Sequence, residues 1–196
     1  MNIGILASHN GTNLQAIIDA IDNGKLNAHV TVVISNNSKS GAAKRAKKHS
    51  IPFCHLSGIT HPDPELLDAA ILKVLSENET DIIFLAGYMK KLGTKTLKKY
   101  EGKILNTHPA LLPKFGGKGM FGMNVHEAVI VAKEVASGVS IHLVDENYDT
   151  GKVIAQTRVP VTLLDTPESL CERVMARERQ FIIEILNEII DGKIRL

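Results

Sequence analysis

Continuous apolar runs and amphipathic segments alternate through the first hundred residues of the chain. The apolar runs are typical of strands that a sheet buries on both faces, and they cover residues 2–7, 30–35, 81–87 and 104–108. The amphipathic segments repeat apolar residues at helical spacing, and they cover residues 13–22, 42–49, 64–76 and 94–99. Strands separated by helices of this length predict βαβ units. We therefore expect an α/β fold, with an open, mostly parallel twisted sheet and helices on both faces.

The pattern changes after residue 110. A glycine-rich loop precedes a helix predicted over residues 125–133, and two further strands, 140–144 and 153–159, flank a polar loop. These strands predict an antiparallel addition to the sheet near the C-terminal part. Thr166 and Pro167 mark the start of a last long helix. No repeat or linker interrupts the pattern, so residues 1–196 are expected to form a single domain.

Helix 13–22 carries a start signal of its own. Thr12 is followed three residues later by Gln15, which is the spacing of a capping box, and Gly24 is placed to end the helix.

Composition narrows the function classes. With 44% hydrophobic and 22% charged residues, the chain is not of the disordered class. Its net charge of +2 and the absence of Trp disfavour a nucleic-acid partner, and no apolar run is long enough for a membrane span. The basic runs 44–48 and 90–99 are interpreted as solvated helix faces or anion-attracting rims. The presence of only two cysteines predicts that the protein works in the reducing cytoplasm. The sequence leaves the oligomeric state open.

The turn after the first predicted strand, residues 8–13, is a candidate anion site. Ligands of open α/β sheets bind beyond the carboxyl ends of strands, where the next helix presents free N–H groups. The turn has neither the G-x-G-x-x-G fingerprint nor a P-loop, since no Gly-Lys pair precedes Ser or Thr. A helix start without a ligand is the alternative interpretation.

A second candidate is the pair Asn106 and His108, which lie two residues apart at the end of a strand and therefore on the same side. An amide beside an imidazole can stabilise an oxyanion and transfer a proton. Asp149, in the later polar loop, would orient His108 and favour its protonated form if the two were close. The alternatives are a surface histidine and an aspartate that serves only its turn.

Other chemistries have little support. The eight histidines show no H-E-x-x-H spacing, and the chain lacks a serine-nucleophile elbow or a cysteine-nucleophile signature. No metal site is expected.

Four motifs occur together in one order: residues 8–15 (SHNGTNLQ), 85–89 (LAGYM), 106–113 (NTHPALLP) and 149–151 (DTG). With them, the chain resembles the folate-dependent formyltransferases, and specifically the phosphoribosylglycinamide formyltransferase branch, over almost its whole length. The resemblance implies a Rossmann-like fold and transfer of a formyl group from 10-formyltetrahydrofolate, as co-substrate, to the amine of 5′-phosphoribosylglycinamide in de novo purine biosynthesis.

The resemblance also implies site residues. The implied catalytic residues are Asn106, His108 and Asp149. The implied ribonucleotide-binding residues are Asn10, Gly11, Thr12, Asn13 and Glu178, and the implied folate-binding residues are Met89, Lys90, Leu92, Asn106, Asp145 and Asp149.

Departures and alternatives remain. Lys90 stands where many relatives have arginine, loop 114–124 is longer and richer in glycine, and the roles of that loop, Lys118 and His126 are open. The alternatives are a 10-formyltetrahydrofolate hydrolase, a formyltransferase for another amine and a non-catalytic binding protein.

Overall fold

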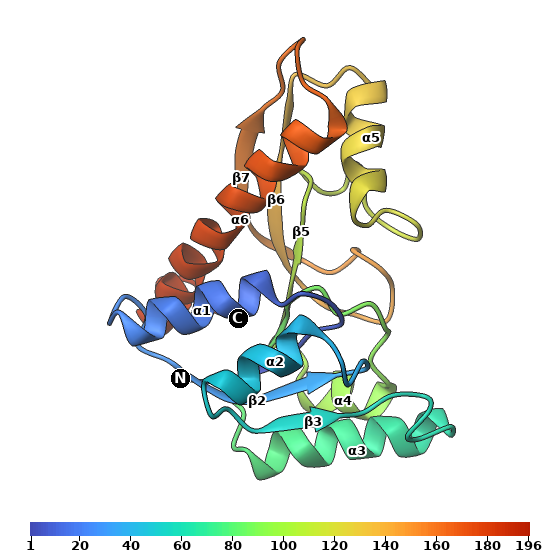
Figure 1. Ribbon diagram of the computed structural model, residues 1–196, viewed down its shortest axis with the longest axis vertical. Coiled ribbons are helices and arrows are strands. Elements are labelled where there is room, and N and C mark those ends of the chain that lie inside the picture. The colour runs from blue at the N-terminus through green and yellow to red at the C-terminus, as the bar shows by residue number, and fades with distance from the viewer.

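A computed structural model describes residues 1–196 and contains one seven-stranded sheet in the order β3-β2-β1-β4-β5-β6-β7 (Figure 1). Strands β1 to β5 are parallel, β6 is antiparallel to β5, and β7 is antiparallel to β6, which confirms the predicted antiparallel addition. The strands are β1 (Asn2–Leu6), β2 (His29–Ser35), β3 (Phe53–His55), β4 (Ile82–Leu85), β5 (Ile104–His108), β6 (Ala136–Leu143) and β7 (Val153–Pro160). The helices are α1 (Thr12–Asp22), α2 (Gly41–Lys48), α3 (Pro64–Glu77), α4 (Thr94–Lys99), α5 (Met123–Val131) and α6 (Pro167–Ile190).

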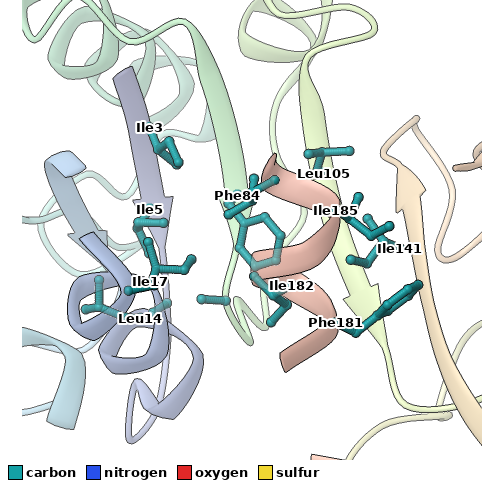
Figure 2. Packing of buried hydrophobic residues seen from close by; sticks show 14 of the residues in the cluster. Ile3, Ile5, Leu14, Ile17, Phe84, Leu105, Ile141, Phe181, Ile182 and Ile185 are labelled. Atoms are coloured by element: carbon teal, nitrogen blue, oxygen red, sulfur yellow. The ribbon is translucent and has the colours of Figure 1, made fainter. Parts of the chain in front are cut away.

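The apolar runs form strands that are covered on both faces. Alternate residues of β4 enter two separate cores, with Phe84 in one and Ile83 in the other. The first core includes residues of α1, α2 and α6, and the second includes residues of α3. Figure 1 shows α2 and α3 on opposite sides of β2 and β3. Figure 2 shows Ile182 of α6 beside Phe84, on the same face as Ile17 of α1.

The start of α1 differs from its prediction. The N-cap is Gly11, which has φ 67° and makes no side-chain capping bond, so the predicted Thr12–Gln15 capping box is wrong. Gln15 instead interacts with Asp19 and Arg45. A capping box does form at α6, between Thr166 and Ser169. Gln15 therefore bonds to other side chains instead of capping the start of its own helix.

Two boundaries in the C-terminal part also differ. Helix α5 starts at Met123 and ends at Val131, two residues before the prediction at both ends. Strand β6 starts at Ala136 rather than residue 140, because its first residues pair with the end of β7. No helix combines the length and apolar character needed to cross a membrane.

Candidate active site

Four segments meet beside the carboxyl ends of β1, β4 and β5: the start of α1, residues 87–92, the end of β5, and loop 144–152. Two cavities lie between them, of about 460 Å³ and about 70 Å³. Both are lined by Asn106, Asp149, Tyr88 and Tyr148. This position agrees with the rule that ligands of open α/β sheets bind at the carboxyl ends of strands.

Asp149 lies beside His108, although the two are far apart in the sequence. The Asp149 Oδ2 is 3.6 Å from the His108 Nδ1, and both side chains are largely buried, with 12% and 5% exposed. Asp149 has φ 58°, a left-handed conformation that Asp tolerates better than most residues. The structure thus brings the predicted carboxylate to the predicted imidazole.

His142 belongs to the same cluster, and the sequence did not single it out. It lies opposite Asn106 in the β5–β6 register, with its Nε2 3.0 Å from the Asn106 Nδ2 and 3.5 Å from the Asp149 Oδ1. The His142 Nδ1 is 2.8 Å from the Leu143 carbonyl oxygen, to which it donates. In the neutral ring, Nε2 therefore accepts one Asn106 amide hydrogen, and the second amide hydrogen has no partner in the protein.

Burial decides the charge of His108. It lowers the pKa of His108 below its usual value, and the opposing effects of Asp149 and of the Phe115 carbonyl only partly offset it. This direction opposes the expectation of a protonated His108 in the site without ligands. Asp149 behaves differently: burial raises its pKa, but contacts with His142, His108 and the Gly117 N–H outweigh burial and hold the pKa below its usual range. Both groups therefore lose their protons more readily than the free side chains do.

The glycine-rich loop contacts both members of this pair through its backbone. The Phe115 carbonyl accepts a hydrogen bond from the His108 Nε2 at 2.7 Å, and the Gly117 N–H donates to the Asp149 Oδ2 at 2.9 Å. Lys118 lines the larger cavity, whereas His126 is buried in α5 and its Nδ1 has no partner. The loop is thus part of the cavity wall.

The predicted ribonucleotide residues divide between two places. Asn13 and Glu178 line the larger cavity, while Asn10 and Thr12 line a separate open depression of about 410 Å³, and Gly11 is the N-cap of α1. Glu178 is buried, and its Oε1 accepts a hydrogen bond from the Thr107 hydroxyl at 3.0 Å. Burial raises the pKa of Glu178.

The predicted folate-binding residues also lie in two different cavities. Met89 lines the larger cavity, and Lys90, Leu92 and Asp145 line the smaller one. Asp145 accepts hydrogen bonds from the Asn147 N–H and the Thr150 hydroxyl, so its carboxylate already stabilises its own loop.

Lys91, which the sequence did not single out, connects the two walls of the smaller cavity. Its Nζ donates to the Glu146 carbonyl at 2.7 Å and lies 4.9 Å from the centre of the Tyr148 ring. No signal in the sequence distinguishes Lys91 from the neighbouring lysines. No group of three or more His, Cys, Asp or Glu side chains that could hold a metal ion is present.

Comparison with known proteins identifies the family. The formyl transferase family model matches residues 1–186. Phosphoribosylglycinamide formyltransferase of Haemophilus influenzae is 36% identical, over 99% of this chain and 89% of that protein. This chain belongs to the phosphoribosylglycinamide formyltransferase family.

A chloroplastic family member of Vigna unguiculata is 38% identical over 98% of this chain, and the chain spans 62% of that protein's length. The fold matches the family as well. The crystal structure of phosphoribosylglycinamide formyltransferase from Bacillus halodurans superposes with a TM-score of 0.89 at 36% identity, covering 97% of this chain and 95% of that one.

Proposed function

We propose that this protein transfers the formyl group of 10-formyltetrahydrofolate to the amine of 5′-phosphoribosylglycinamide, a step of purine biosynthesis. One observation carries the proposal: Asn106 and Asp149 line both cavities, and His108 lies beside them in the larger one. Two substrates, one in each cavity, would meet at these three side chains. Holding two reactants together in this way supplies a large part of the acceleration in a bimolecular transfer.

The walls of the two cavities support an assignment of the substrates. The smaller cavity has apolar walls at Leu85, Leu92 and Val144, which suit the flat pteridine ring of the folate. The larger cavity is lined by Asn13 and Glu178, whose polar side chains suit the ribonucleotide.

The chemistry begins with attack of the uncharged amine on the formyl carbon. A carbon–nitrogen bond forms, the carbonyl π electrons move to oxygen, and the free Asn106 amide hydrogen donates to that oxyanion. Neutral His108 accepts the proton that the amine gives up, and Asp149 stabilises the imidazolium so formed. When the carbon–nitrogen bond to the folate breaks, His108 returns this proton to the leaving nitrogen. For these steps to occur, a substrate group must replace the Phe115 carbonyl at the His108 Nε2, and the neutral ring must carry its proton on Nδ1, beside Asp149, so that Nε2 can accept the amine proton.

Tetrahydrofolate formation tests the proposal. We expect purified protein to convert 10-formyltetrahydrofolate only when the ribonucleotide is present. His108→Ala should lower kcat by about 10²–10⁴-fold, because proton transfer contributes that much, and Asn106→Ala by about 10²–10³-fold. His29→Ala is the matched control, since His29 is exposed at the start of β2, and it should keep full activity.

Three results would contradict the proposal. Turnover without the ribonucleotide would indicate a hydrolase. Turnover only with another amine would indicate a different acceptor. Tight binding of both substrates without turnover would indicate a binding protein.

The domain organisation and the compartment are part of the same proposal. One sheet includes strands from β1 to β7, which supports a single domain over residues 1–196. Cys54 and Cys171 are both free, which supports a reducing compartment such as the cytoplasm. Cell fractionation checks the second point, and recovery in an oxidising compartment would refute it.

A further inference from the structure

Arg45 of α2 holds the turn that precedes α1 at two points. Its Nε donates to the Asn10 carbonyl oxygen at 2.9 Å, and its Nη1 donates to the Gln15 Oε1 at 2.7 Å. Asn10 lies before the first residue of α1 and Gln15 lies in its first turn. One rigid guanidinium therefore connects the loop to the helix that follows it.

The backbone of α2 packs against the same turn. The Ala42 N–H donates to the His9 carbonyl at 3.2 Å. A Cβ atom at Gly41 would lie 2.5 Å from the Asn10 carbonyl oxygen, and one at Gly11 would lie 2.9 Å from the Ala42 Cα. No space for a side chain remains between the turn and α2, so the two are in close backbone contact.

The hydrogen bond to Asn10 also sets the direction of the next N–H group. In a trans peptide the C=O and N–H bonds point in opposite directions. Because Arg45 binds the Asn10 carbonyl, the Gly11 N–H must point away from Arg45. The N–H groups of Gly11, Thr12 and Asn13 make no hydrogen bond within the protein, so they are free for an anion at the helix start.

We propose that Arg45 is a positioning residue for the phosphate of the ribonucleotide, acting through the peptide that joins Asn10 and Gly11. The inference rests on the proposed function, which places the phosphate at this turn. Arg45 acts through its two hydrogen bonds to the turn and to α1, so its contribution is geometric and differs from that of a cation that merely attracts the phosphate.

Substitution of a neighbouring lysine distinguishes the effect of Arg45's hydrogen bonds from the effect of its positive charge. Lys44 precedes Arg45 on α2, lines the same open depression and is exposed, and its Nζ makes no hydrogen bond. Lys44→Met therefore removes one positive charge without loosening the turn, whereas Arg45→Met removes the same charge together with both hydrogen bonds. Arg45→Lys keeps the charge and loses the two-point contact, because a single ammonium group lacks the fork of the guanidinium.

The test is steady-state kinetics with the ribonucleotide and with its dephosphorylated nucleoside. We expect Arg45→Met to raise KM for the ribonucleotide about 10-fold, the usual size for loss of a charge-assisted hydrogen bond, with KM for the folate unchanged. Arg45→Lys should raise the same KM several-fold, and Lys44→Met should change it less than about 2-fold. With the nucleoside, Arg45→Met and the parent should have equal KM, which a merely structural role would not produce.

Several results would overturn the proposal. Arg45→Lys kinetics equal to those of the parent, or an equal effect of Lys44→Met and Arg45→Met, would show that charge alone matters. A parallel rise in KM for the nucleoside would show a general effect on folding. Failure of the proposed function would be seen earlier and separately, as absence of ribonucleotide-dependent turnover in the parent protein, and it would remove this inference too.

Discussion

Two glycines at opposite ends of α1 offer a matched test of how closely α2 presses on the turn. Gly11 precedes the helix with φ 67°, and Gly24 follows it with φ 66°. Alanine at either position adopts the same unfavourable left-handed backbone. Only at Gly11 would the new Cβ meet another atom, the Ala42 Cα at 2.9 Å, because nothing lies within 4 Å of a Cβ at Gly24.

The expected free energies follow from these two situations. A left-handed alanine costs roughly 1–2 kcal/mol, and reduced entropy of the unfolded chain returns about 0.4–1 kcal/mol. Gly24→Ala should therefore lower the free energy of unfolding by about 1 kcal/mol. Gly11→Ala carries the same cost plus about 1–3 kcal/mol for overpacking against backbone, for a total of about 2–4 kcal/mol.

Urea unfolding of the two variants and the parent measures the difference. We expect Gly11→Ala to be less stable than Gly24→Ala by about 2 kcal/mol, or roughly 4–8 °C in Tm for a chain of this length. Gly11→Ala should also raise KM for the ribonucleotide, and Gly24→Ala should not. Equal losses of stability in the two variants would refute the close packing between α2 and the turn, on which the proposed role of Arg45 depends.

Two further predictions concern buried carboxylates. Asp68 of α3 accepts hydrogen bonds from the N–H groups of Lys95 and Thr96 at the start of α4 and from the Thr96 hydroxyl. Asp68→Ala should therefore lower the free energy of unfolding, measured in urea, by about 2–4 kcal/mol. A loss below about 1 kcal/mol would contradict this role. Glu178→Gln should stabilise the protein at pH 8, because burial raises the pKa of Glu178 and the folded state disfavours its ionised form. The gain should disappear as the pH falls below about 4.5, where the unfolded chain is protonated as well. A gain that is the same at every pH would show that charge is not its cause. Because the Gln amide oxygen can still accept from Thr107, a packing loss should not obscure the result.

The sequence by itself determined the class of fold and the chemistry. A strand covered on both faces needs a continuous apolar run, and a covering helix needs an apolar stripe, so both patterns are local and readable. The motif around Asn106 and His108 is also local, since two residues at a spacing of two share one side of a strand. The family resemblance rested on such short segments, and the comparisons confirmed it.

Only the tertiary structure decided which distant groups meet. The approach of Asp149 to His108 and the pairing of His142 with Asn106 depend on the register of an antiparallel strand, which short-range pattern does not specify. The wrong capping box at Thr12 has the same origin, because Gln15 is engaged by Arg45 from another helix.

The charge of His108 is likewise a property of the folded site. A nearby carboxylate raises the pKa of a histidine and burial lowers it, and their balance depends on how much water the fold excludes. The sequence supplied the reactive groups, and packing decided their protonation, their partners and the turn that Arg45 holds in place.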